Sequence, residues 1–186
     1  AQATGYRAGA QATGDYAGAQ ATGYRAGAQA TGDYAGAQAT GYRAGAQATG
    51  DYAGVQATGY RAGAQATGYR AGAQATGDCV GAQATGDYAG VQATGKWAVS
   101  LAIGDNSSAT IQSPEGEKIT EGCAISLGIK GKAKGQKGCW LTLAEWEKDK
   151  NDNWHRIDVQ TKHIDGKKIK ENTWYRLVNG KFTQEK

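Results

Sequence analysis

Small and polar side chains alternate in short segments over residues 1–99, and the same nine-residue pattern recurs eleven times. The consensus unit is Ala-Gln-Ala-Thr-Gly-x-x-Ala-Gly. In Ala-Gln-Ala-Thr the first and third positions are small and apolar and the second and fourth are polar, which is the period of a strand. The pattern predicts strands with alanines facing inward and Gln and Thr facing outward, flanked by glycines that permit turns.

Self-similarity at a short fixed period indicates units that are stable only when stacked on their neighbours. Two glycines per unit and the absence of a 3.6-residue apolar period disfavour a helix. Glycine is not every third residue, which excludes collagen. Disorder is the alternative, but the inward alanines are preserved except at Val55 and Val91, which favours packing. The expected fold is all-β: a parallel β-solenoid (β-roll) of nine-residue repeats with a small antiparallel β C-terminal domain.

The variable pair of each unit bears on the number of residues per coil. It alternates between Tyr-Arg and Asp-Tyr through Arg61, so the period there is 18 residues. An 18-residue coil would stack tyrosines well but would also stack Arg7 on Arg25 and Asp15 on Asp33, which repel. A coil with an odd number of units, or three chains wound together, would place Arg beside Asp or Tyr instead. Precedent for two-layer β-rolls favours 18, and both arrangements stay open.

Beyond the array the pattern decays into related stretches. Ala-Val-Ser-Leu-Ala-Ile-Gly begins at Ala98, and Cys-Ala-Ile-Ser-Leu-Gly begins at Cys123 and leads into residues 129–135. These stretches resemble the head repeats of YadA-like trimeric autotransporter adhesins, although the common unit of that family differs in length. The resemblance covers residues 1–135 loosely and extends to bacterial and bacteriophage fibre proteins. It implies a parallel β-roll, a homotrimer, and a location on a cell surface, outside the cell or in a phage particle.

Three segments are expected. Residues 1–99 form the nine-residue-repeat solenoid, and residues 100–138 form degenerate coils with a projecting loop over residues 105–122 that contains Pro114, the sole proline. Residues 139–186 form an antiparallel β capping domain. A cap is expected because repeat arrays need an end that closes the last coil.

Within the capping segment, alternating patterns predict strands over residues 139–147 and 154–162. An Asp-Gly turn at Asp165 and an Asn-Gly turn at Asn179 predict further hairpins. Together they predict one antiparallel meander that places bulky apolar side chains over the thin, alanine-filled interior.

Composition and charge narrow the classes of partner. The chain has 186 residues and a net charge of +4, but residues 1–99 contain six basic and five acidic side chains. This near-neutral array argues against nucleic acid as a partner and permits close lateral packing. No run of 18 apolar residues exists, so no membrane span is predicted. The chain opens within the repeat pattern and lacks an initiator methionine, which suggests a piece of a longer array with an open edge that favours self-assembly.

The sequence contains few candidates for catalysis. His155 and His163, with Asp158 or Glu145, are the candidates for an acid–base pair or half a metal site, but two half-exposed strand histidines explain them better. The three cysteines form no CxxC motif, so zinc is not expected: Cys79, Cys123 and Cys139. The glycine- and lysine-rich residues 128–138 lack the Gly-Lys-Ser/Thr of a P-loop. A polyanion site there is an alternative to a final solenoid turn. No enzyme activity, cofactor or metal is expected.

The repeated surface is the candidate functional feature. Its ladder residues are Thr4, Thr13, Thr22, Thr31, Thr40, Thr49, Thr58, Tyr6, Tyr24, Tyr42 and Tyr60. The expected function is non-enzymatic: a rigid shaft of an extracellular filament, surface appendage or phage fibre, assembled as a homo-oligomer (trimer or filament). The alternatives are ice binding by the threonines, which resemble the Thr-x-Thr faces of insect antifreeze proteins, and binding of a glycan or cell-surface receptor by the tyrosines.

Overall fold

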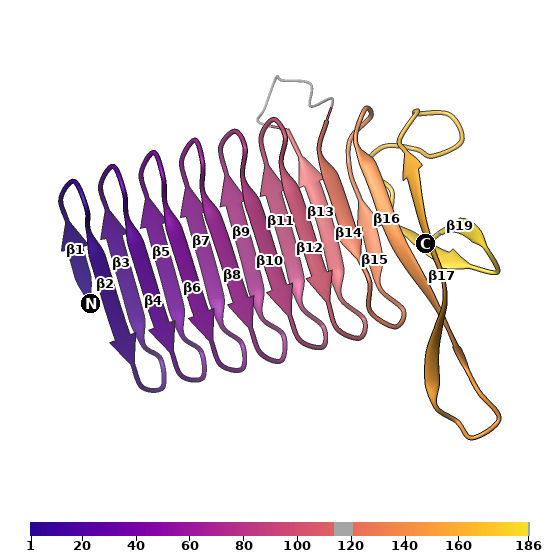
Figure 1. The fold of residues 1–186 in the computed structure, drawn as a ribbon, viewed down its shortest axis with the longest axis horizontal. Coiled ribbons are helices and arrows are strands. Elements are labelled where there is room, and N and C mark those ends of the chain that lie inside the picture. Colours follow the sequence, from indigo (N-terminus) through magenta and orange to yellow (C-terminus); the bar gives the residue numbers. More distant parts are fainter. Residues whose placement is uncertain (114–120, 186) are drawn as a thin grey trace.

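Successive strands alternate between two sheets in the computed structural model, which describes residues 1–113 and 121–185 (Figure 1). These residues form no helix. Sheet A contains, in spatial order, β1 (Gln2–Thr4), β3 (Gly18–Thr22), β5 (Gly36–Thr40), β7 (Gly54–Thr58), β9 (Gly72–Thr76), β11 (Gly90–Thr94), β13 (Ser108–Gln112), β15 (Lys132–Lys134), β18 (Tyr175–Val178) and β19 (Lys181–Gln184). Sheet B contains β17 (Trp154–His163), β16 (Trp140–Lys148), β14 (Cys123–Ser126), β12 (Val99–Ile103), β10 (Gly81–Thr85), β8 (Gly63–Thr67), β6 (Gly45–Thr49), β4 (Gly27–Thr31) and β2 (Gly9–Thr13).

Each coil of the array contains 18 residues. Strands two apart in the chain pair in parallel, so that Ala10 lies beside Ala28 in sheet B and Ala19 beside Ala37 in sheet A. The same offset holds for every strand pair from β1 to β11. The expected parallel β-solenoid is confirmed, and of the arrangements left open by the sequence the two-strand coil is the one formed.

Alanine fills the interior because the strand period turns alternate side chains inward. In β4 the outward Gly27, Gln29 and Thr31 are exposed, whereas Ala28 and Ala30 are buried. The residue before most strands of the array, such as Ala26 or Val80, is buried as well. Three small side chains per unit therefore make a thin interior, in which Val55 and Val91 are the larger members of an alanine column.

From the second coil of the array onward, the close approach of the preceding coil requires glycine after each threonine. A Cβ on Gly41 would lie 1.6 Å from the carbonyl oxygen of Gly23, and one on Gly59 would lie 1.6 Å from that of Gly41. Several glycines at the same place also have positive φ, for example Gly50 at 138°. The second glycine of each unit is different, because a Cβ on Gly45 would meet nothing within 4 Å.

The prediction of a loop over residues 105–122 is wrong for residues 108–112. Residues 108–112 form β13, which pairs in parallel with β11 and β15. Ala109 continues the alanine column and Ile111 is fully buried, so these residues have the inward pattern of a strand. Pro114 lies outside the described residues.

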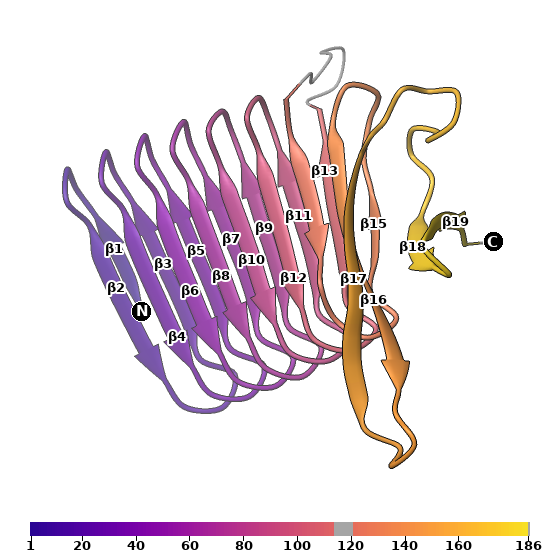
Figure 2. The ribbon, with the colours of Figure 1, turned by 45° about the vertical axis from the view of Figure 1, so that its right-hand side comes forward.

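Antiparallel strands occur near the C-terminus, but they form two hairpins rather than one meander. The longer hairpin, β16–β17, ends sheet B, and β16 also pairs in parallel with β14, so it continues the solenoid (Figure 2). The shorter hairpin, β18–β19, turns at Asn179–Gly180 as predicted and ends sheet A through β18 and β15. Residues 164–174 form no strand; the carboxylate of Asp165 accepts three backbone hydrogen bonds there instead.

Bulky side chains close the interior at this end. The fully buried group consists of Ile111, Leu141, Leu143, Ile164 and Tyr175. They belong to one cluster with the alanines of the array. Glu145 joins the hairpins by accepting hydrogen bonds from the backbone N–H groups of Asn179 and Gly180.

Candidate functional surfaces

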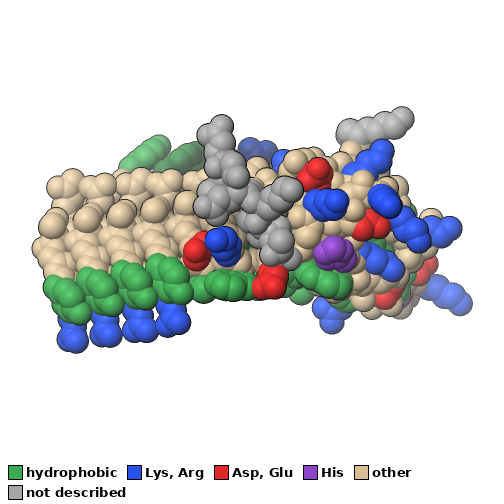
Figure 3. Space-filling model, turned by 90° about the horizontal axis from the view of Figure 1, so that it is seen from above, with side chains coloured by type: hydrophobic (Ala, Val, Ile, Leu, Met, Phe, Trp, Pro, Cys, Tyr) green, Lys and Arg blue, Asp and Glu red, His purple; other side chains and the backbone are tan. Residues whose placement is uncertain are grey.

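The 18-residue coil sorts the charges of the array onto two opposite edges. Turns from sheet A to sheet B, at the top of Figure 1, contain Arg7, Arg25, Arg43 and Arg61; we call this the arginine edge. Turns from sheet B back to sheet A contain Asp15, Asp33, Asp51 and Asp87; we call this the aspartate edge. Figure 3 shows the arginines as a continuous row beside a row of apolar rings.

Tyrosines stack in a column on each edge. On the arginine edge the ring centroids of Tyr6, Tyr24, Tyr42 and Tyr60 are 5.0–5.1 Å apart, with interplanar angles of 3–14°. On the aspartate edge the rings of Tyr16, Tyr34 and Tyr52 are 5.0 Å apart. These tyrosines form the column that an 18-residue coil implies. Rings inside a column, such as Tyr24 and Tyr34, have a neighbouring ring on both faces and present their edges to solvent, whereas the end rings Tyr6 and Tyr16 have a neighbour on one face.

The aspartate column is held by the backbone of the next coil. Oδ1 of Asp33 accepts a hydrogen bond from the backbone N–H of Asp51 at 3.2 Å, and Oδ1 of Asp51 accepts one from Tyr69 at 3.0 Å. Asp87 accepts in the same way from Asp105. The carboxylates are therefore stabilised by N–H donors, which offset the repulsion between like charges.

The order of the variable pairs breaks at three turns of the array, which contain Tyr69-Arg70, Asp78-Cys79 and Lys96-Trp97. On the aspartate edge the guanidinium of Arg70 lies over the rings of Tyr52, Tyr69 and Tyr88, 5.4–5.9 Å from their centroids. On the arginine edge Asp78 and Cys79 replace the Tyr-Arg pair. Charge interaction with the Cys79 side chain and, after it, a hydrogen bond between the two side chains raise the pKa of Tyr60 above its ordinary value.

The two sheet faces of the array carry no charged side chains. Gln side chains form a ladder on each face, in which Nε2 donates to the Oε1 of the next coil. On sheet A examples are Gln38 to Gln56 at 3.1 Å and Gln56 to Gln74 at 3.0 Å, and on sheet B the ladder runs from Gln11 to Gln65. The predicted threonines separate into two exposed ladders on opposite faces: Thr4, Thr22, Thr40 and Thr58 on sheet A, and Thr13, Thr31 and Thr49 on sheet B. A shallow groove runs along the glycine row of sheet B, beside its Gln ladder.

The histidines of β17 are not brought together with the carboxylates named for them. His163 lies opposite Trp140, with 5.0 Å between ring centroids, and His155 lies opposite Glu147. Asp158 accepts a hydrogen bond from Gln160, while Glu145 binds the other hairpin. Among the described residues no three His, Cys, Asp or Glu side chains form a group that could hold a metal ion.

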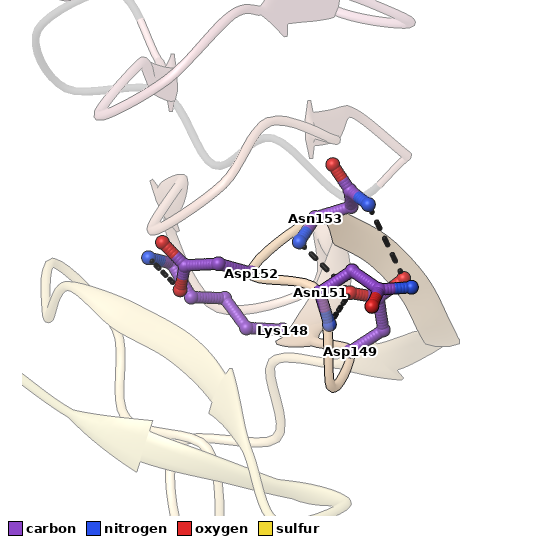
Figure 4. Close-up of polar contacts among 5 residues, drawn as sticks. All are labelled: Lys148, Asp149, Asn151, Asp152 and Asn153. Atoms are coloured by element: carbon purple, nitrogen blue, oxygen red, sulfur yellow. Dashed lines mark hydrogen bonds and ion pairs between the residues drawn. The ribbon is translucent and has the colours of Figure 1, made fainter.

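The acidic turn between β16 and β17 has a local structural explanation (Figure 4). Asp149 accepts hydrogen bonds from the backbone N–H groups of Asn151 at 2.7 Å and Asn153 at 2.9 Å, and Lys148 pairs with Asp152 at 2.6 Å. The hydrogen bond from the backbone N–H of Asn153 lowers the pKa of Asp149 most, and the one from Asn151 lowers it by a smaller amount. These contacts fix the turn.

The lysine-rich segment and the cysteines are also explained by packing. Lys132 pairs with Glu185 at 3.0 Å, and Lys132 and Lys134 both lie over the ring of Trp174. These lysines therefore anchor the second hairpin. All three cysteines are free, and burial raises the pKa of Cys123 and Cys139.

An apolar patch on the outer face of sheet B was missed from the sequence. The patch comprises Val99, Ile103, Trp140, Ile157 and Val159, each 38–47 % exposed. In Val-Ser-Leu-Ala-Ile the larger residues face outward, because the inward positions continue the small-residue columns of the array. The sequence signal for this patch is therefore the row of large apolar residues on the outward side of that segment.

No protein family, curated protein or solved structure matched this chain. No helix in the described part of the chain could span a membrane.

Proposed function

We propose that this chain is a non-enzymatic structural protein, a rigid β-solenoid shaft of an extracellular filament, surface appendage or phage fibre, assembled from several copies. The observation that carries the proposal is the axial bonding between coils. The strands keep one constant register from β1 to β11, and beside them run the Gln ladder of sheet A, from Gln2 to Gln92, and the stacked tyrosines from Tyr6 to Tyr60. Each ladder resists bending and stretching along the axis, so length is gained without loss of stiffness.

Small-angle scattering and negative-stain imaging of the full chain test this role. The proposal expects elongated, multi-copy particles (a trimer or a filament) whose stain images show straight rods. Isolated single chains at all concentrations, or flexible coils without rods, would contradict it.

Ice binding is the second candidate, favoured by the threonine ladders. Thr22, Thr40 and Thr58 are exposed, in register and on a flat, uncharged face. Thermal hysteresis of the full chain is the test, with a triple Thr→Lys variant at these positions as the partner sample. Hysteresis lost in the variant supports this function, and none at high concentration of the wild type excludes it.

A further inference from the structure

The sign of charge changes at one matching place on each edge. Along the arginine edge the charged residues are Arg7, Arg25, Arg43, Arg61, Asp78 and Lys96. Along the aspartate edge they are Asp15, Asp33, Asp51, Arg70, Asp87 and Asp105. In the turns between β1 and β13, each edge thus holds a single residue of opposite sign, Asp78 on the first and Arg70 on the second.

The two edges also share one axial spacing. Both belong to the same coils, and the stacked tyrosines on them repeat at 5.0–5.1 Å and 5.0 Å. Arg25 and Arg43 are exposed, as are Asp15 and Asp33. When two copies lie side by side with parallel axes, every coil of one edge therefore meets a coil of the other at the same repeat.

Along the axis, each turn of one edge lies midway between two turns of the other edge. The second copy can therefore shift by half a coil in either direction, which gives two registers. Shifting the second copy half a coil one way sets Arg7 opposite Asp15, but it also sets Arg61 opposite Arg70 and Asp78 opposite Asp87. Shifting it the other way gives only opposite charges. Its pairs are Arg25–Asp15, Arg43–Asp33, Arg61–Asp51, Asp78–Arg70 and Lys96–Asp87.

We propose that the arginine edge of one copy binds the aspartate edge of a second, parallel copy in the register that sets Arg25 opposite Asp15. The exposed tyrosine columns of both edges lie in the same contact and add apolar area. Because the joined surfaces differ, the contact is heterologous and each copy keeps one free edge, so the product is an open ribbon of solenoids. This inference deepens the proposed structural role and rests on it.

Charge exchange between two variants tests the contact. One variant carries Arg25→Glu, Arg43→Glu and Arg61→Glu, which makes both edges acidic. The other carries Asp15→Lys, Asp33→Lys and Asp51→Lys, which makes both edges basic. Sedimentation velocity at about 20 mM salt is the measurement, since charge interactions are least screened there. Circular dichroism checks the fold of each sample.

The wild type is expected to associate, and more weakly as salt increases. Each variant alone should associate about a hundredfold more weakly, from roughly a factor of five per reversed pair, while the mixture of both should associate again. A mixture of folded variants that stays monomeric would overturn the proposal. If the Lys variant does not fold, Asp→Asn at the same positions replaces it, because Asn keeps the acceptor oxygen; unchanged association of that variant would equally overturn the proposal.

A second experiment tests the register. The variants are Arg70→Asp, Asp78→Arg and the double variant that carries both changes. If Arg70 and Asp78 only relieve repulsion within their own columns, the double variant must associate more weakly than either single variant, because both of its columns are uniform in sign, and this result would overturn the register. If the two residues pair across the contact, the double variant must associate more strongly than either single variant.

The failure of this inference is separable from failure of the structural role. Multi-copy rods that form but are insensitive to the charge exchanges would remove the edge contact and leave the shaft function in place. A wild type that is monomeric at every salt concentration would remove both.

Discussion

Asp33 and Asp51 occupy equivalent positions in successive coils, and the backbone N–H of Asp51 donates to Oδ1 of Asp33 at 3.2 Å. Two like charges are thus neighbours in the fold and yet linked by a hydrogen bond. This relation explains why a period of 18 is compatible with a column of aspartates, which simple charge arithmetic disfavours. The hydrogen bond that the carboxylate accepts from the next coil offsets its repulsion by the next carboxylate.

Replacement of Asp51 separates its charge from its acceptor oxygen. Asp51→Ala leaves the backbone N–H of Tyr69 without this partner and should lower the free energy of unfolding by about 0.5–1 kcal/mol. Asp51→Asn keeps an acceptor and removes a like charge, so it should be neutral. Chemical denaturation of both variants is the measurement; an Asn variant as destabilised as the Ala variant would show that the charge itself matters.

Two glycines four residues apart should respond differently to alanine. Gly41→Ala places a Cβ 1.6 Å from the carbonyl oxygen of Gly23, so the coils must separate, and a loss above about 3 kcal/mol is expected. Gly45→Ala, the matched control, meets nothing within 4 Å and should be tolerated or slightly stabilising. The shift in midpoint on thermal unfolding compares them. Equal effects would contradict the coil spacing.

A carboxylate within the glutamine ladder should weaken it in a pH-dependent way. Gln56 donates to Gln74 at 3.0 Å and accepts from Gln38 at 3.1 Å. Gln56→Glu removes the donor at neutral pH and should cost about 1 kcal/mol. Below the ordinary glutamate pKa of about 4.3 the protonated side chain regains a donor, so the difference from wild type should shrink. A difference that is constant from pH 7 to acid would show that loss of the donated hydrogen bond is not its cause.

The Cys139 thiol should lose its proton at a higher pH than an ordinary thiol and should react slowly. Burial raises the pKa of Cys139, whose side chain is fully buried, above the ordinary thiol value. The neutral thiol is therefore favoured in the folded state, so the stability is fully present below the ordinary thiol pKa and is lost as the pH rises through the raised one. Alkylation of the native protein should be slow at Cys139 and fast only after unfolding. Rapid labelling at neutral pH in the folded state would contradict its burial.

The array was predictable because one local rule is repeated. Alternation in Ala-Gln-Ala-Thr sets the inward side, and the glycines fix the turns, so strand and face follow from any single unit. The number of residues per coil was harder, since the hydrogen bond from Asp51 to Asp33 lies between residues 18 positions apart and has no local signal.

The C-terminal part was less predictable because pairing there is not local. Residues 139–147 and 154–162 alternate as strands, but nothing in them shows that β16 also pairs with β14. β13 was missed for a related reason, since Thr110 and Ile111 interrupt the alternation and both are buried. The sorting of charge onto two edges became visible only once the coil length was known.

The central claim is that copies of this solenoid assemble, and light scattering coupled to size exclusion tests it most directly. The full chain should elute as an elongated particle with a mass of several times 19.3 kDa at low salt. Its mass should fall as salt is added, because the edges carry opposite charge. A compact particle with the mass of one chain, at every salt and protein concentration, would contradict the account.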